Sequence, residues 1–563
     1  MTSEISIPHI TYLAIMPELF MIGGALALVL ASSLVRRRLS TTFNTAVAVV
    51  VSVGALVASL LLWHSVGDTG AHATMDGSVA ADGFSAFFLT LVSSASLLSA
   101  LVADGYLRRE RIRGPEHYAL AMLACAGAML MASAADLIAI FLGLEILSIA
   151  LYVLVGMDVR RGESREAAMK YFVLGAFSSA VFLYGIALVY GATGSTNLAE
   201  IAKFLSQNVL VSNGVLLAGV AFLVAGFGFK VAAVPFHMWT PDVYQGAPTS
   251  VTAFMGAVAK AGGFAALLRV FYSSLFTLRQ DWQPIIWALA VASMVVGAVM
   301  AVVQRDVKRM LAYSSINHAG LILLGLEAAT SKGMSGALYY LFVYAVLVIA
   351  SFAVVNVVGG PNGNDIDKYR GLSSRQPLLA GAFALLLLAQ AGVPFTAGFL
   401  AKFYVISAVV ASGSDALAVV AMMSVVIAAF FYLRVVMALF SPVARPAGAT
   451  GASAVLGDAT SRQAVATEMA AGAEVGSAAG ARGVATALAS RSAASDAGDS
   501  SGLRAGNAYS SRSSEEVAVV EAQAPRVPLA TACVIGASVA FTVFFGIVAS
   551  PLVNFAHAAT LLF

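Results

Sequence analysis

The chain has 563 residues, of which 60% are hydrophobic and only 11% are charged. Soluble domains carry about 25% charged residues, so this composition excludes an ordinary water-soluble protein and points to lipid as the solvent. The formal net charge of +3 is too small to indicate a nucleic-acid partner.

Apolar stretches long enough to cross a bilayer recur along almost the whole chain. A spanning helix needs about 20 apolar residues, and the first stretch is not a cleavable signal peptide, because the basic cluster follows it. The sequence therefore predicts an all-α polytopic membrane protein with about 14 transmembrane helices. The predicted spans are 12–34, 42–63, 84–103, 117–135, 137–156, 168–191, 212–239, 248–271, 284–303, 310–328, 334–357, 377–410, 415–440 and 528–556.

Basic residues are concentrated in alternate loops. With the N-terminus outside, the outer loops contain only Lys203, Arg279 and Lys332. The positive-inside rule then predicts a bacterial inner-membrane protein with both termini in the periplasm. The basic residues of the cytoplasmic loops are Arg36–Arg38, Arg108, Arg109, Arg111, Arg113, Arg160, Arg161, Arg165, Arg305, Lys308, Arg309, Lys368, Arg370 and Arg375.

Residues 441–526 interrupt this pattern, because they are rich in Ala, Ser and Gly and contain few large apolar side chains. Such a segment buries too little surface to offset its ordering entropy, so we expect a disordered cytoplasmic insertion, with an Ala-rich partial helix as the alternative. The remaining divisions are helices 1–3 in 1–116, two five-helix units in 117–272 and 284–440, and a last helix in 527–563.

The two five-helix units share a motif. Lys230 precedes Val234-Pro235-Phe236 in the seventh span, and Lys402 follows Val393-Pro394-Phe395 in the twelfth. These spans are five apart and so cross the membrane in opposite directions, as in transporters with inverted repeats and interrupted helices. Proline removes a helical hydrogen bond, which predicts a break and free carbonyls at Val231 and Gln390. A simple kink is the alternative.

Ionisable side chains inside apolar spans are the strongest functional signal. Glu145, Lys230, Lys260 and Lys402 lie near span centres, where each charge costs roughly 2.5–3.5 kcal/mol, so we expect them to face water or one another. Lys170 lies nearer a helix end, where its side chain could instead reach the headgroups. A carboxylate beside a desolvated lysine makes a proton switch; a static ion pair is the alternative for any one pair.

Two histidines and two charged residues are the remaining ionisable candidates in the predicted spans. His237 follows the Pro235 break and His318 lies near Ser314 and Ser315; either could relay protons or serve as a packing residue. Glu18 is expected at the membrane interface. Arg434 is expected near the cytoplasmic end of its span.

Several motifs resemble one family. They are Phe229-Lys230 with Val234-Pro235-Phe236-His237-Met238-Trp239-Thr240-Pro241-Asp242-Val243-Tyr244-Gln245-Gly246-Ala247-Pro248, then Gly143-Leu144-Glu145-Ile146-Leu147-Ser148, Ala312-Tyr313-Ser314-Ser315-Ile316, and Gly392-Val393-Pro394-Phe395 with Lys402-Phe403-Tyr404. Over about residues 10–440 and the last span, they resemble the antiporter-like membrane subunits of respiratory complex I, NADH–quinone oxidoreductase. The stretch Asp242–Pro248 and the lysine at 402 resemble the subunit N branch.

The resemblance implies fourteen helices with two inverted five-helix repeats, and a proton-translocating subunit without a redox centre. It implies that Glu145 pairs with Lys230, that Lys260 is the central lysine of the eighth helix, and that Lys402 is that of the twelfth. His237 and Lys170 are further candidates. The 441–526 insertion departs from the family pattern.

The resemblance also implies partners and cofactors. Quinone, FMN and iron–sulfur clusters would be on other subunits, since neither cysteines nor glycine motifs suggest a site here. The partners would be the antiporter-like subunit M, the small subunits K and J, and the lipid bilayer. The alternatives are a subunit of a cation/proton antiporter or of a related membrane-bound oxidoreductase, and a passive structural spacer.

Overall fold

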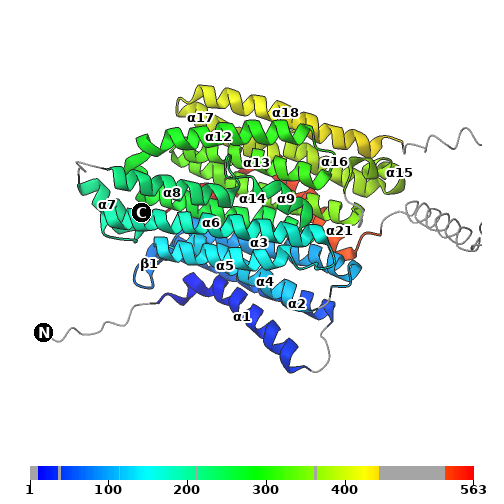
Figure 1. Ribbon diagram of the computed structural model, residues 1–563, viewed down its shortest axis with the longest axis horizontal. Helices are drawn as coiled ribbons and strands as arrows, with labels where there is room; N and C mark the ends of the chain where they lie inside the picture. Colours follow the sequence, from blue (N-terminus) through cyan, green and yellow to red (C-terminus); the bar gives the residue numbers. More distant parts are fainter. Residues whose placement is uncertain are drawn as a thin grey trace, which may run out of the picture. The chain divides into compact units, whose positions relative to one another are not determined.

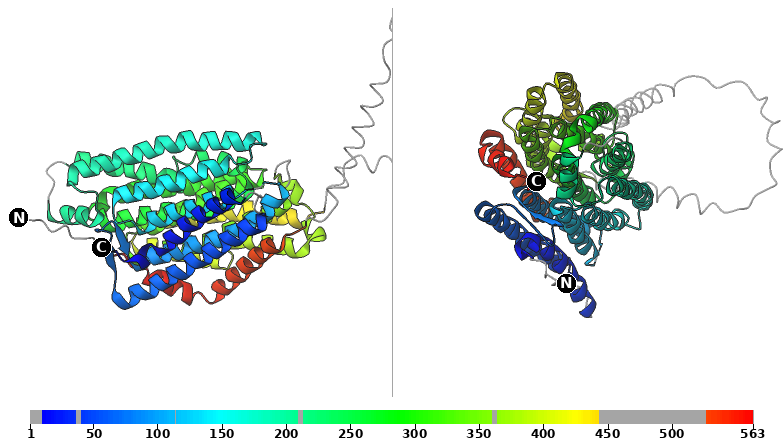
Figure 2. Two further views of the ribbon diagram at one scale, coloured as in Figure 1. Left: turned by 90° about the horizontal axis from the view of Figure 1, so that it is seen from below. Right: turned by 90° about the vertical axis from the view of Figure 1, so that its left-hand side faces the viewer.

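A computed structural model describes residues 10–35, 40–112, 114–208, 213–359, 364–442 and 526–562. Met1–Phe440 and Pro525–Phe563 form one compact unit, whose helices run side by side (Figures 1 and 2). The predicted insertion at 441–526 lies, apart from residues 441, 442 and 526, outside the described residues.

The unit is built almost entirely of helices. The first half contains α1 (Tyr12–Leu34), α2 (Thr41–Thr69), α3 (Gly83–Arg109), α4 (Glu116–Ser133), α5 (Leu137–Val155), α6 (Gly162–Thr193), α7 (Leu198–Gln207), α8 (Gly214–Val231) and α9 (Trp239–Gly246). A short antiparallel hairpin of β1 (His72–Thr74) and β2 (Val79–Ala81) lies between α2 and α3.

The second half begins with α10 (Thr249–Phe254), the π-helix η1 (Met255–Ala259), α11 (Lys260–Arg269), the π-helix η2 (Val270–Ser274) and the 3-10 turn η3 (Phe276–Leu278). It continues with α12 (Arg279–Val302), α13 (Val307–Glu327), α14 (Ser331–Val358), η4 (Ile366–Tyr369), α15 (Leu372–Arg375), α16 (Pro377–Ala391), α17 (Ala397–Ala411), α18 (Asp415–Phe440), α21 (Leu529–Ile547) and α22 (Ser550–Ala558).

Each predicted span overlaps one helix or a consecutive series of helices. Within the described ranges, eleven helices are long and apolar enough to cross a membrane, and the shorter apolar helices α16 and α17 add a pair. The chain is therefore an all-α, multi-pass membrane protein. The total of fourteen crossings stays a prediction.

Both proline motifs interrupt a helix, as predicted. α8 ends at Val231, and Ala232 then adopts a left-handed conformation with φ of 62° before α9 begins at Trp239. α16 ends at Ala391, and Gly392 has φ of 94°. Glycine tolerates this conformation without strain. A Cβ built on Gly392 would also lie 3.0 Å from Cδ of Lys402, so the lysine packs directly against the break.

The N-terminal cap of α5 at Asp136 has a counterpart at the start of α13, at Asp306. Asp136 accepts hydrogen bonds from the first amides of α5 and forms an isolated antiparallel bridge with Asn197. Asp306 caps α13 in the same way and forms an antiparallel bridge with Asp365. In each case the partner segment follows the next long helix, α6 or α14. This repeated arrangement supports two structurally related units.

Contacts among the loops define two opposite ends of the helices. At the hairpin face, which contains β1 and β2, the Thr11 amide donates to Thr74 Oγ1 at 2.8 Å and the Leu562 amide donates to Asp82 Oδ2 at 3.0 Å. Both ends of the unit therefore lie at the same face, as the even span count requires. The other end, here called the arginine-rich face, contains Arg109, Arg309 and Arg434.

Candidate functional site

Lys230 lies at the C-terminal end of α8, immediately before the first break, and is only 5% exposed. Its Nζ donates to Ser148 Oγ at 2.8 Å. Ser148 is one helical turn from Glu145 on α5, and the two charged groups lie close enough to interact electrostatically. No ion pair joins them among the described side chains, and Glu145 Oε1 is buried without a hydrogen-bond partner. The Ser148 hydroxyl that accepts from Lys230 itself donates to the Leu144 carbonyl at 2.5 Å, so the carboxylate and the amine are neighbours without a direct bond.

Lys260 lies at the junction between the π-helix η1 and α11. Its Nζ donates to the carbonyl and the hydroxyl of Ser315 on α13, at 2.5 and 2.7 Å, and lies 5.3 Å from the ring centroid of Tyr344. The side chain is 3% exposed, and no carboxylate lies within ion-pairing distance in the described structure. π-Helical turns frequently mark functional sites, and here one immediately precedes the buried amine.

Lys402 lies on α17 and reaches back to the second break. Its Nζ donates to the carbonyls of Gln390 at 2.7 Å and Ala391 at 2.8 Å. The sequence predicts that Pro394 frees the Gln390 carbonyl, and the structure shows that the lysine binds it. Backbone acceptors within a membrane must be satisfied by the protein or by enclosed water, and a buried ammonium does this here.

A tyrosine–histidine cluster lies between Lys260 and Lys402. His318 Nδ1 lies 2.6 Å from the Tyr340 hydroxyl, and Nε2 lies 3.0 Å from the Tyr432 hydroxyl. His318 and Lys402 line the same small cavity, and Ser315, which binds Lys260, lies one helical turn before His318 on α13. The imidazole therefore lies near both amines, as the sequence alone does not reveal.

Tyr432 on α18 connects this cluster to both lysines. Its hydroxyl is hydrogen-bonded to Ser314 and donates to Gln390 Oε1 at 3.3 Å. Ser314 is the neighbour of Ser315, which binds Lys260, and Gln390 provides a carbonyl for Lys402. Polar contacts around Tyr432 thus reach a residue beside each amine's partner, Ser314 next to Ser315 and the side chain of Gln390, whose carbonyl binds Lys402.

Small cavities border two of the lysines. One lies between α5, α6 and α8 beside Ser148, Tyr152 and Lys230, and another lies beside His318, Gln390 and Lys402. Each leaves about 10 Å³ for the centre of a water molecule, which is the space that one water needs. The amines are therefore buried but adjacent to space that water can enter.

The structure does not bring Lys170 and His237 into this cluster. The Lys170 side chain is 43% exposed and forms ion pairs with Glu166 at 2.8 Å and Asp242 at 2.9 Å near the arginine-rich face. His237 lies in the break after α8, and its buried Nδ1 has no hydrogen-bond partner in the described chain. Lys170 thus lies in the surface environment that the sequence leaves open as its alternative.

The structure buries two charged residues that the sequence assigns to the membrane surface. Glu18 is 7% exposed and accepts from Ser133 Oγ at 3.1 Å, because α1 packs against α4. Lys308, counted as a loop residue, is 1% exposed and donates to the Ala247 carbonyl at 2.7 Å. That bond places a positive charge at the C-terminus of α9, where the helix dipole is favourable.

Arg434 is placed as expected, at one end of its helix. It donates through Nη1 to the Val302 carbonyl at 2.6 Å and through Nη2 to the Gln304 carbonyl. The guanidinium therefore satisfies carbonyls at the C-terminal end of α12, on the arginine-rich face.

Sequence reasoning missed a buried ion pair and the tyrosines. Arg269 binds Asp82 through two bonds of 2.9 Å, and both side chains are almost completely buried. Both residues lie near ends of predicted spans, where charge is ordinary. Tyr340 and Tyr432 give no signal in sequence, because an aromatic residue in an apolar span looks like core. Among the described residues, no group of three or more His, Cys, Asp or Glu side chains could hold a metal ion.

Comparison with known proteins places this site in a family. A family model described as "NADH:quinone oxidoreductase/Mrp antiporter, TM" matches residues 134–428, the region that contains Glu145, Lys230, Lys260 and Lys402. The chain superimposes on a chain of the Mrp complex from Dietzia sp. with a TM-score of 0.75, at 21% identity, covering 97% of this chain and 96% of the other. The fold and the buried lysines therefore define an antiporter-like membrane protein.

More similar relatives narrow the assignment. NADH-quinone oxidoreductase subunit N from Trichlorobacter lovleyi is 43% identical over 429 residues, which cover 76% of this chain and 87% of the relative. A chain of respiratory complex I from Thermus thermophilus is 33% identical with a TM-score of 0.65, covering 76% of this chain and 91% of the other. The chain belongs to the NADH-quinone oxidoreductase subunit N family.

Proposed function

We propose that this chain is a proton-translocating membrane subunit of NADH–quinone oxidoreductase, in which Glu145, Lys230, Lys260 and Lys402 hold and transfer protons. The observation that supports this most directly is the environment of the lysines. Each is at least 95% buried, yet each binds hydroxyl or carbonyl oxygens rather than a carboxylate. A neutral acceptor does not lock the amine in its charged form, so the amine can lose and regain a proton.

The proposed order of proton transfer follows the polar contacts. Glu145 and Lys230 form one switch around Ser148, since movement of either group changes which of them holds the proton. Lys260, His318 and Lys402 form a second series through Ser315, Tyr432 and Gln390. His237, in the first break, is a candidate relay that exchanges protons with water. Lys170, in its surface ion pairs, is a candidate at the arginine-rich side.

Substitution of Lys260 tests the proposal. We expect Lys260→Ala to leave the complex assembled and to abolish most proton pumping and coupled quinone reduction, because the central amine is lost. The measurements are quinone reductase activity and ΔpH formation in membrane vesicles, with assembly checked by native electrophoresis. Lys203→Ala is the matched control, because Lys203 is exposed on α7 at the hairpin face. Unchanged pumping by an assembled Lys260→Ala complex would instead indicate a structural spacer.

A cation/proton antiporter subunit is the second candidate, because the matching family description names both types of protein. Proteoliposomes containing the isolated chain distinguish the two candidates. Proton flux in these proteoliposomes that requires Na⁺ or K⁺ would support the antiporter. No flux from the isolated chain, together with flux independent of both ions in vesicles containing the assembled oxidoreductase, would support the first proposal.

The proposed function also implies particular partners, a membrane orientation and a division of the chain. We propose a membrane arm in which the antiporter-like subunit M and the small subunits K and J are neighbours, and in which quinone, FMN and iron–sulfur clusters are on other subunits. The alternation of basic loops supports a bacterial inner membrane with the arginine-rich face in the cytoplasm and both termini in the periplasm. The repeated capping at Asp136 and Asp306 supports division into inverted units at 117–272 and 284–440, after helices 1–3 in 1–116 and before the last helix in 527–563.

A further inference from the structure

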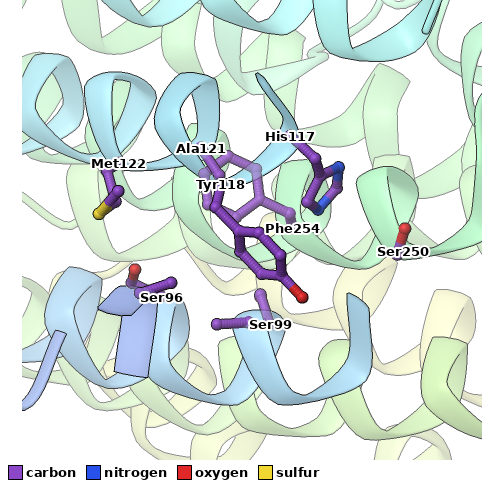
Figure 3. A pocket seen from close by; sticks show the side chains of 10 residues that line it. Ser96, Ser99, His117, Tyr118, Ala121, Met122, Ser250 and Phe254 are labelled. Atoms are coloured by element: carbon purple, nitrogen blue, oxygen red, sulfur yellow. The ribbon is translucent and has the colours of Figure 1, made fainter. Parts of the chain in front are cut away.

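A separate polar cavity lies between α2, α3, α4 and α10, towards the arginine-rich face. Figure 3 shows His117 and Tyr118 from α4, Ser99 from α3 and Ser250 from α10 around the same space. The wall formed by α10 continues through η1 directly to Lys260. None of the four residues belongs to the cluster of Lys230, Lys260 and Lys402.

Two hydroxyl groups that line this cavity have no hydrogen-bond partner. Ser99 is 5% exposed and Ser250 is 2% exposed, and the Oγ atom of each is buried without a partner among the described residues. A buried hydroxyl left without a hydrogen bond costs about 1–3 kcal/mol. Two such groups lining one cavity therefore indicate that a polar molecule is bound there.

His117 adds a third polar group with a defined proton. Its Nδ1 lies 3.3 Å from Sδ of Met157, and a thioether sulfur can only accept, so this contact places the proton on Nδ1. Nε2 then carries the lone pair and can accept from a molecule in the cavity. Tyr118 is already satisfied through Thr45, at 2.8 Å.

The volume of the cavity is sufficient for one bound water molecule. It leaves about 20 Å³ for the centre of a water molecule, more than the 10–15 Å³ that one water needs, and bound waters typically make about three hydrogen bonds. Ser99, Ser250 and His117 provide three. The surrounding Phe254 and Met122 exclude larger polar ligands.

We propose that this cavity is a water-binding site at which His117 exchanges protons with water on the side of the arginine-rich face. Nε2 accepts a proton from a protonated cavity water and later returns it to that water. The inference rests on the proposed function for the proton exchange, but the water site itself does not.

Radiolytic footprinting with X-rays tests the water site in the assembled complex, because bound water produces hydroxyl radicals that oxidise the side chains touching it. Met122 lines the cavity, whereas Met129, two turns along the same helix, does not; both are almost fully buried. We expect Met122 to be oxidised several-fold faster than Met129, and Ser250→Val to remove the difference. Equal protection of the two methionines in the unaltered complex would overturn the proposal.

A measurement of proton pumping tests the role of His117. We expect His117→Phe, which keeps a ring but removes the lone pair, to lower the proton-pumping rate several-fold while the complex stays assembled. His64→Phe is the control, because His64 is exposed on α2. Normal pumping by His117→Phe with rapid Met122 oxidation would overturn the proton-exchange role. Failure of the Lys260 test would count against the proposed function and leave the Met122 comparison unaffected.

Discussion

At the scale of single residues, the buried lysines are arranged for exchange rather than for fixed charge pairing. Lys260 binds a serine and Lys402 binds two carbonyls freed by a helix break. Their stems pack closely, which fixes the amines in place. The Cβ of an alanine at Gly263 would lie 3.2 Å from Cγ of Lys230. Gly263, on the helix that carries Lys260, therefore leaves room for the Lys230 side chain to pack against that helix.

Tyr432 is the residue whose hydroxyl contacts groups next to both Lys260 and Lys402. We expect Tyr432→Phe to lower proton pumping about tenfold, less than the roughly 10²–10⁴-fold of a direct acid–base group, because its hydroxyl contacts Ser314, His318 and Gln390 but neither lysine amine. The ratio of protons pumped to quinone reduced, measured in vesicles, checks this.

Tyr106→Phe is the matched control for Tyr432→Phe. Tyr106 is also buried, but its hydroxyl faces Arg161 and contacts none of Ser314, His318 and Gln390, so its removal leaves the proposed route intact. If both variants pumped equally well, Tyr432 would not be part of the route.

At the scale of the elements, charged caps hold helix ends together inside an apolar unit. Lys308 binds the C-terminus of α9 and Arg434 binds that of α12. The largest cap is Arg269, which donates to Asp82, Ser85 and the Ala132 carbonyl. Asp82 caps α3 and accepts from Leu562, so one ion pair joins α3, α4, α11 and the end of the chain.

Loss of one partner of this pair is expected to be costly. We expect Asp82→Ala to destabilise the protein by about 3–5 kcal/mol, because it leaves Arg269 buried and unpaired. The double variant Asp82→Leu/Arg269→Met should recover much of that loss, since it buries no charge. The midpoint of thermal unfolding of the detergent-solubilised complex measures both effects. A double variant that is less stable than Asp82→Ala would contradict the argument.

At the scale of the whole molecule, the distribution of charge supports the proposed direction across the membrane. Arg109, Arg309 and Arg434 lie at one end of the helices. Thr11 and Leu562 lie at the other. We expect an impermeant maleimide added to intact spheroplasts to label Lys203→Cys but not Arg370→Cys, in a background without Cys125 and Cys533. Lysed cells should label both. The reverse pattern would invert the proposed orientation.

Most of the insertion at 441–526 lies outside the described residues, and its composition alone supports a prediction. Removal of residues 446–522 should leave quinone reductase activity and pumping close to normal, because a segment with few large apolar residues builds no core. A severe loss of activity with normal assembly would show that the segment binds a partner needed for turnover.

The sequence by itself determined the all-α membrane class, the spans, both helix breaks and the buried lysines. These features are local: an apolar run, a proline or a charge in an apolar run has a large free-energy consequence wherever the chain folds. The alternation of basic loops also predicts the direction of the spans, because it reports a sum over short segments, and that direction stays a prediction.

Only the tertiary structure decided which polar groups meet. Glu145 lies beside Ser148 and Lys230 without an ion pair, and His318 rather than His237 lies near the other two lysines. Glu18 and Lys308 are buried, and Arg269 finds Asp82 across 187 residues of sequence. These outcomes depend on the angle at which helices pack and on the register between them, which composition does not encode. A tyrosine in an apolar span looks the same in sequence whether its hydroxyl meets lipid or a histidine.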